Sequence, residues 1–245
     1  QTKPANIWCS GNSLLASGAV LVTGGTLDWT PDWKGLNKVY TFNPFTETWT
    51  TQPDMRHGRW YPTNAELADG RTVIFGGLDE TGLGFATHRN VDIEIFTPST
   101  DPSGVGTMTL LGTRTSGSGG DATHAPNGSY YPHTFLMPSG NVLMAGPFAE
   151  DSWILNNPGA SNAYSWQNFA NTATDRVWGN AVLLPGSTAG STKVMQIGGS
   201  QSTGGTNLSV RTSETIDESN LGAGWQAASS WNIGRGHANT VLLPD

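Results

Sequence analysis

The sequence has only one cysteine, Cys9, among 245 residues, which excludes an internal disulfide framework. Charged side chains are scarce as well: they make up 13% of the chain, and 12 Lys and Arg against 19 Asp and Glu leave a net charge of -7. Because the basic residues form no cluster, we expect no nucleic-acid partner. No apolar run approaches the length of a bilayer-spanning helix, so we also expect no membrane span.

Glycine and tryptophan are abundant instead, with 32 and 10 residues. Four short runs rich in branched apolar residues predict buried strands at residues 19–23, 71–75, 141–144 and 193–197. A glycine landmark ends each run: Gly24-Gly25, Gly76-Gly77, the degenerate Ala145-Gly146, and Gly198-Gly199. The spacing of about fifty residues is typical of kelch repeats. We therefore predict an all-β, kelch-type β-propeller with four to five blades represented.

Each unit continues with an aromatic or apolar strand, and most then have a tryptophan. We expect Trp49, Trp166 and Trp225 to pack between neighbouring blades. A fifth unit starts at Trp231, and the sequence stops where the other units place their turn glycine. An open array of blades would leave unpaired sheet edges. We expect residues 1–245 to be part of a single propeller domain that continues beyond residue 245.

One position of the repeat collects unusual side chains. Counting back nine residues from the turn glycines Gly18, Gly70 and Gly140 gives Cys9, Tyr61 and Tyr131. The same count gives His237 in the fifth unit, and the less regular fourth unit has Val177 or Trp178 near this place. A generic core position would collect valine, leucine and isoleucine instead. Equal offsets in equal repeats predict that these side chains face one central region.

A thiol beside a phenol in such a region favours a thioether-linked, copper-bound tyrosyl radical. Phenolate and imidazole bind copper well, and a tyrosine joined to sulfur is more easily oxidised. The alternative is structural: a lone buried cysteine such as Cys9 is usually a small apolar side chain. Tyrosine and histidine at strand starts can equally serve by hydrogen-bonding loop backbone.

Several segments resemble the copper radical oxidase family, which includes galactose oxidase and the glyoxal oxidases. They are Trp8 to Gly11, Arg59 to Thr63, the hairpin Asp69-Gly70-Arg71, and Tyr131-Pro132 continued by Leu136 to Gly140. The resemblance covers nearly the whole chain. It implies a seven-bladed kelch propeller with one copper ion near its axis. It also implies oxidation of a primary alcohol or aldehyde by O2, which yields H2O2.

The resemblance implies a role for each matching residue. Cys9 would be cross-linked to Tyr61, and Tyr61 would be both the radical tyrosine and a copper ligand. Tyr131, His237 and Trp60 would lie at the substrate pocket, with Trp60, Trp29 or Trp33 as candidates to shield the radical. The family's other ligands, a Tyr-His pair and a further histidine, belong to motifs expected after residue 245. No arginine near Tyr130-Tyr131 matches the one that binds sugar hydroxyls, which disfavours galactose as substrate.

Two other functions stay open. A kelch propeller can bind a protein or glycan through its loops without catalysis, because a fold alone does not define function. A structural extracellular protein is the other alternative, with Trp29 and Trp33 as carbohydrate contacts. Few lysines, many small polar residues and the sequons at Asn127 and Asn207 predict a secreted protein.

Overall fold

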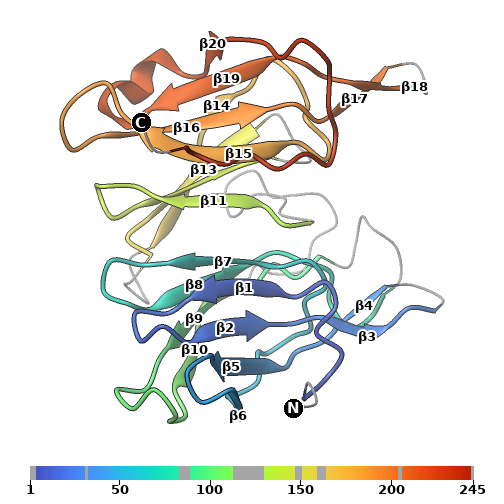
Figure 1. The fold of residues 1–245 in the computed structure, drawn as a ribbon, viewed down its shortest axis with the longest axis vertical. Coiled ribbons are helices and arrows are strands. Elements are labelled where there is room, and N and C mark those ends of the chain that lie inside the picture. Colours follow the sequence, from blue (N-terminus) through green and yellow to red (C-terminus); the bar gives the residue numbers. More distant parts are fainter. Residues whose placement is uncertain are drawn as a thin grey trace. The chain divides into compact units, whose positions relative to one another are not determined.

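The computed structural model describes residues 4–30, 33–82, 89–112, 130–146, 151–158, 164–203 and 206–243. The chain divides into two compact units, Gln1–Pro132 with Asn157–Ser165, and His133–Asn156 with Trp166–Asp245. Nearly all the regular structure is β-strand, and it forms four four-stranded antiparallel sheets, two in each unit (Figure 1). The sequon at Asn127 lies outside the described residues.

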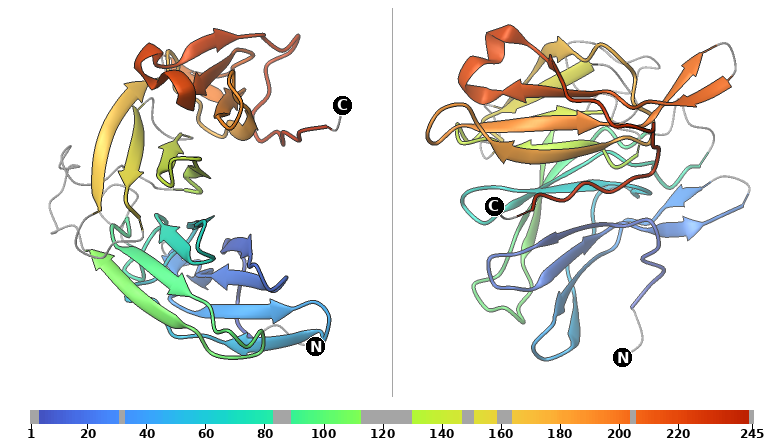
Figure 2. Two further views of the ribbon diagram at one scale, coloured as in Figure 1. Left: turned by 90° about the vertical axis from the view of Figure 1, so that its left-hand side faces the viewer. Right: turned by 45° about the horizontal axis from the view of Figure 1, so that its top comes forward.

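The first unit contains two of these sheets and a hairpin. In the first sheet the order is β1 (Gly11–Leu14), β2 (Val20–Thr23), β5 (Val39–Asn43) and β6 (Thr48–Thr51). In the second it is β7 (Thr63–Glu66), β8 (Thr72–Phe75), β9 (Ile93–Thr97) and β10 (Thr107–Gly112). The short strands β3 (Thr26–Asp28) and β4 (Lys34–Gly35) form a hairpin that extends away from the first sheet (Figure 1, Figure 2).

The second unit repeats the plan. Its sheets are β11 (His133–Leu136), β12 (Val142–Ala145), β13 (Asp151–Asn156) and β14 (Ser165–Asn171), then β15 (Asn180–Pro185), β16 (Thr192–Ile197), β19 (Ser213–Asp217) and β20 (Gln226–Ala228). A hairpin of β17 (Ser200–Thr203) and β18 (Thr206–Ser209) and the 3-10 helix η1 (Glu218–Ala223) complete it. Residues 231–243, the described part of the fifth unit, form no strand.

The turn glycines explain why the sheets start alike. Gly18, Gly70 and Gly140 have φ values of 82°, 81° and 84°, in the left-handed region that glycine enters without a steric penalty. Each closes a hairpin between the first two strands of its sheet. The second strand then pairs on both sides, so its branched apolar residues are buried. The four predicted strand runs are therefore confirmed.

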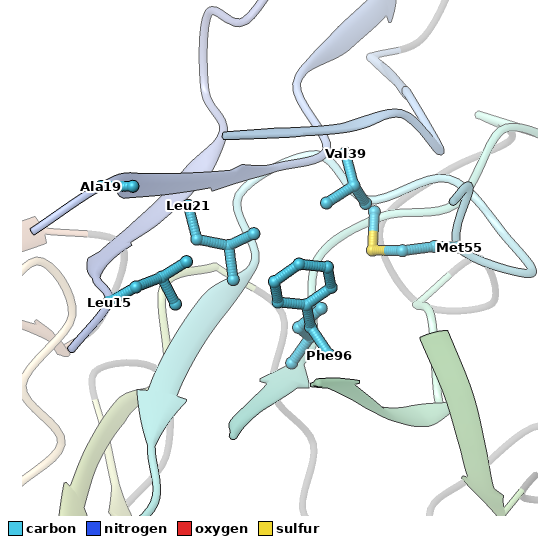
Figure 3. Packing of buried hydrophobic residues seen from close by; sticks show 7 residues of the cluster. Leu15, Ala19, Leu21, Val39, Met55 and Phe96 are labelled. Carbon is cyan, nitrogen blue, oxygen red and sulfur yellow. The ribbon is translucent and has the colours of Figure 1, made fainter. Parts of the chain in front are cut away.

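Side chains from both sheets of the first unit form its core. Leu15, Leu21 and Phe96 point toward one another there, with Val39 and Met55 beside them (Figure 3). In the second unit the core is formed by Met137, Leu143, Ile154, Val194 and Ile216. In both units, neighbouring sheets are held together by interdigitated apolar side chains, as expected of propeller blades.

The expectation for the unit-ending tryptophans is confirmed for one of them. Trp225 packs against the core of the second unit, and its Nε1 donates a 2.8 Å hydrogen bond to Oγ of Ser152 on the neighbouring sheet. Trp49 instead packs on rings of its own sheet, 4.9 Å from Phe42 and 6.4 Å from Tyr40. On β6, an outer strand, Trp49 lies beside the cross-strand aromatic residues of β5.

Candidate functional site

The unusual repeat position has an unusual backbone. Cys9, Tyr61, Tyr131, Trp178 and His237 have φ values of 63°, 66°, 43°, 59° and 52°. They are five of the seven non-glycine residues with positive φ in the described part of the chain. Such a residue costs about 1–3 kcal/mol and persists only where its surroundings hold it. In the fourth unit the sequence left Val177 and Trp178 as alternatives, and the positive φ of Trp178 identifies it as the equivalent residue.

A hydrogen-bond ladder holds these strained residues. The N–H of Tyr61 donates to the carbonyl oxygen of Cys9 at 2.8 Å, and the N–H of Tyr131 donates to that of Tyr61 at 2.8 Å. In the second unit the N–H of His237 donates to the carbonyl oxygen of Trp178 at 2.9 Å. Each link joins the same position in successive repeats. In the first unit, the ladder brings Cys9, Tyr61 and Tyr131 together.

The side chains of Cys9 and Tyr61 meet. The phenol of Tyr61 is hydrogen-bonded to the side chain of Cys9, and the thiol forms no disulfide. Burial, and then the hydrogen bond to Cys9, raises the pKa of Tyr61 to about 12. Tyr61 is therefore a protonated phenol at neutral pH, and it must lose that proton before it can serve as a metal ligand.

Aromatic rings cover both faces of Tyr61. The Trp60 ring lies 3.9 Å away at an interplanar angle of 8°, and the Tyr131 ring lies 4.5 Å away at 21°. Successive side chains of an extended strand point to opposite faces. The left-handed φ of Tyr61 breaks this alternation, so its ring can fold back onto that of Trp60. Tyr130 adds an edge contact to Tyr61 at 5.6 Å.

Hydrogen bonds fix the rings of this stack. Nε1 of Trp60 donates to Oγ1 of Thr26 at 3.1 Å, and that hydroxyl donates to the carbonyl oxygen of Trp8 at 2.9 Å. The hydroxyl of Tyr131 donates to the carbonyl oxygen of Ser10 at 3.3 Å, and burial raises the pKa of Tyr131. Trp60 is only 6% exposed, whereas Tyr131 is 38% exposed. Tyr131 therefore presents an accessible ring on one face of Tyr61.

His237 belongs to the second unit. Its imidazole is exposed and stacks on the ring of Trp178 at 4.7 Å, with an interplanar angle of 21°. The two neighbouring repeat positions of this unit thus pair an indole with an imidazole. The corresponding positions of the first unit pair aromatic rings of Tyr61 and Tyr131. The ring-on-ring contact is a shared feature of the repeat position.

Tyr61 fits a copper site as one ligand, but the site would be incomplete with the described residues alone. Within them, no group of three or more His, Cys, Asp and Glu side chains is placed to hold a metal ion. Copper in proteins is bound by several nitrogen and oxygen ligands. A copper ion held through Tyr61 would therefore need further ligands in addition to the described residues.

A buried ion pair that the sequence patterns did not indicate lies behind the site. Arg59 lies two residues before Tyr61, and its guanidinium is 2.8 Å from Oε2 of Glu94, with side chains 0% and 2% exposed. It also donates to the carbonyl oxygens of Gly76 at 2.8 Å and Asp92 at 2.9 Å. Burial lowers the pKa of Arg59, partly opposed by Glu94. This network anchors the segment that leads into Tyr61.

The second unit contains an equivalent buried arginine–glutamate ion pair. Arg176 lies two residues before Trp178, and its guanidinium is 2.8 Å from Oε2 of Glu214 and 3.2 Å from the carbonyl oxygen of Gly198. The signal was present in the sequence as an arginine at a constant offset from the repeat position. Nothing in the sequence, however, states that a given arginine is buried.

Comparison with known proteins agrees with the fold and with the family resemblance. The family described as "Glyoxal oxidase N-terminus" matches residues 2–215. An aldehyde oxidase GLOX of Vitis pseudoreticulata is 39% identical over 77 residues, covering 29% of this chain and 13% of the relative. A galactose oxidase of Gibberella zeae is 25% identical over 201 residues, covering 80% of this chain and 26% of the relative. The chain thus spans no more than about a quarter of these curated relatives.

Solved structures share the fold. A fungal alcohol oxidase of the AA5 family, in complex with copper, superposes with a TM-score of 0.64 at 20% identity, over 95% of this chain and 44% of that one. The structure of YjhT gives a TM-score of 0.62 at 14% identity, over 94% of this chain and 72% of that one. At such identities the likeness concerns the fold.

These findings define the class of protein as a kelch-type β-propeller, which confirms the predicted fold class. The chain belongs to the glyoxal oxidase N-terminus family, within the copper radical oxidases. The resemblance of the chain to the copper radical oxidase family is therefore confirmed.

Proposed function

We propose that this chain is the part of a copper radical oxidase that carries its Cys9–Tyr61 cofactor. The reaction is the oxidation of a primary alcohol to an aldehyde, or of a hydrated aldehyde to an acid, with O2 reduced to H2O2. Two electrons and two protons leave the substrate, and O2 takes up both. The observation that carries the proposal is the contact between the side chains of Cys9 and Tyr61.

Cross-linking follows from that contact. The S–H bond of Cys9 and one ring C–H bond of Tyr61 break, a C–S bond forms, and the two hydrogens reduce O2 to H2O2. The sulfur substituent and the covering rings of Trp60 and Tyr131 then stabilise a Tyr61 radical, which takes a hydrogen atom from the substrate carbon. Copper, when bound with Tyr61 as one ligand, supplies the second one-electron centre and the place where O2 is reduced.

The pocket is assigned to the repeat position and its neighbour. Tyr131 offers the accessible face beside Tyr61, and Trp60 forms the buried wall. Within the described residues around Tyr130 and Tyr131, no arginine stands in the sequence position that binds sugar hydroxyls in galactose oxidase. The substrate class is therefore a small primary alcohol or aldehyde rather than galactose.

The remaining ligands are assigned to further blades, so that residues 1–245 are part of one propeller that continues past residue 245. Arg235 supports this. Its carbonyl oxygen accepts a 2.7 Å hydrogen bond from the N–H of Gly199, as that of Arg59 does from Gly25 at 2.9 Å. Arg59 is buried against a glutamate of its own sheet, whereas Arg235 is exposed over the Trp231 ring at 5.9 Å. A following sheet would supply Arg235 with a glutamate equivalent to Glu94, the partner of Arg59.

Secretion is part of the same proposal, since an oxidase that releases H2O2 suits an extracellular setting. The sequon at Asn207 and the low lysine content support it. Among the described residues, no helix is long and apolar enough to cross a membrane.

Peptide mapping by mass spectrometry tests the proposal on the full-length natural protein. After exposure to copper and O2, we expect a peptide that joins the segments of Cys9 and Tyr61 and weighs two hydrogens less than their sum. The Cys9→Ser and Tyr61→Phe variants should give separate peptides under the same treatment. An unmodified Cys9 thiol in the copper-treated natural protein would overturn the proposal.

A further inference from the structure

The stack around Tyr61 extends past Trp60. The ring of Trp33 lies 5.6 Å from that of Trp60 with an interplanar angle of 14°. Trp33, Trp60, Tyr61 and Tyr131 therefore form a column of four nearly parallel rings. Trp60 is 6% exposed, but Trp33 is 38% exposed. The column thus leads from an accessible indole to the covered phenol.

A second exposed indole meets the same buried ring. Trp29 is 47% exposed, and its edge lies against Trp60 with 6.4 Å between centroids and an interplanar angle of 86°. Trp29 follows β3 and Trp33 precedes β4, so one hairpin carries both. Oδ1 of Asp28 accepts hydrogen bonds from the N–H groups of Trp29 at 2.7 Å and Thr30 at 3.2 Å, which shapes this turn. Two surface indoles therefore converge on Trp60.

We propose that this column is an electron relay, through which an external one-electron oxidant that reaches Trp29 or Trp33 oxidises Tyr61. Indole and phenol are among the side chains most readily oxidised by one electron, and stacked rings bring them into close contact. The use of the relay, to generate the Tyr61 radical from outside, rests on the proposed function. The relay itself rests on the rings alone.

The electrons balance as follows. The oxidant, an outer-sphere metal complex, takes one electron from the indole of Trp33 or Trp29 and is reduced. The resulting indole radical takes one electron from Trp60, and Trp60 takes one from Tyr61. An indole radical cation is a stronger oxidant than a phenoxyl radical at neutral pH, so the transfer runs toward Tyr61. A phenol gives up its O–H proton when it loses an electron, and water takes up that proton in the same process.

Laser flash photolysis of the copper-free full-length protein tests the relay. Photo-oxidised ruthenium tris-bipyridine serves as the oxidant, and the absorption of indole radicals and phenoxyl radicals is followed in time. We expect an indole radical signal that decays as a phenoxyl signal grows. That growth phase should be lost in the Tyr61→Phe variant, which would identify Tyr61 as the phenol oxidised.

Phenylalanine variants separate the relay from mere packing, because phenylalanine keeps a stacked ring but resists oxidation. The growth phase should be lost in the Trp29→Phe/Trp33→Phe double variant and in Trp60→Phe. It should persist in Trp8→Phe, a matched control, since Trp8 is 67% exposed in the same unit. Thermal melting checks that each variant is folded. A growth phase that persists without Trp29 and Trp33, or without Tyr61, would overturn the relay.

The relay and the proposed function fail separately. Suppose that the copper-free protein shows the growth phase but that copper treatment gives no cross-linked peptide. The relay would then stand, and the proposed oxidase function would be wrong. A cross-linked peptide with an unchanged growth phase in the Trp29→Phe/Trp33→Phe variant would do the reverse.

Discussion

The N–H of Tyr61 donates a 2.8 Å hydrogen bond to the carbonyl oxygen of Cys9, so these two residues are joined through their backbones as well as through their side chains. The backbone link does not need the thiol. The strained conformation that aims both side chains at each other is therefore set by the ladder, and the chemistry of the pair can be changed without removing its support.

The first prediction separates these two contributions. In the Cys9→Ala variant, the pKa of Tyr61 should fall from about 12 but stay above the ordinary value of 10, because burial is the larger cause of the shift and the hydrogen bond to Cys9 the smaller. Titration by NMR of ring-labelled tyrosine measures it, with Tyr61→Phe to assign the signal. The unfolding free energy should change by less than about 1 kcal/mol. A pKa that returns to 10 would show that burial does not dominate.

The second prediction compares two glycines with similar backbone angles. Gly24 and Gly70 have φ values of 71° and 81°, so alanine at either would be strained by about 1–2 kcal/mol. At Gly24 a Cβ would also lie 2.2 Å from the carbonyl oxygen of Arg59, whereas at Gly70 nothing lies within 4 Å. Gly24→Ala should therefore lower the unfolding free energy, measured with urea, by about 1–3 kcal/mol more than Gly70→Ala does. Equal losses would mean that the two segments can separate freely.

The third prediction concerns the ion pair behind the site. Arg59→Met should lower the unfolding free energy by about 3–5 kcal/mol, because Glu94 is left buried without its partner. The double variant Arg59→Met/Glu94→Leu should lower the unfolding free energy less than the single variant, because it leaves no unpaired charge buried. The exposed pair of Arg71 and Asp69 is the control, and Arg71→Met should cost less than about 1 kcal/mol. A double variant that loses more than the single one would contradict this account.

The sequence predicts the repeat position well because a hairpin turn has a fixed length. Cys9, Tyr61 and Tyr131 follow from turn glycines in sheets whose first strands have four residues. The count fails in the fourth sheet, where β15 has six residues and the turn glycine, Gly190, lies correspondingly later. Trp178 was therefore left open between two positions, and only its left-handed φ identifies it.

Other features of the site depend on contacts that no local pattern encodes. Trp33 and Trp60 are far apart in sequence, and their stacking depends on how the β3–β4 hairpin packs. The burial of Arg59 likewise depends on the third strand of its sheet, which supplies Glu94. The sequence shows an arginine and a glutamate in suitable repeats, but their pairing requires the whole sheet to be assembled.

The last prediction is a dependence of stability on pH in the second unit. Nδ1 of His133 is buried and has no hydrogen-bond partner among the described residues. Burial lowers the pKa of His133 from 6.5 to about 4. Between these values the unfolded chain binds a proton that the folded protein does not, so stability should fall as the pH falls. Above pH 6.5 the histidine is neutral in both states, and its contribution is constant.

The matched variant is His133→Thr, because Thr63 occupies the equivalent place at the start of β7. Urea unfolding between pH 8 and pH 5 should show a shallower loss of stability in His133→Thr than in the natural protein, and this range keeps above the pH at which carboxylates titrate. The difference between the two proteins at pH 8 reports packing alone, so only the change in that difference with pH reports the proton. If the unfolding free energies of the two proteins changed equally with pH, the prediction would be wrong. The imidazole of His133 would then bind its proton in the folded protein, with water or a neighbouring group in contact with Nδ1.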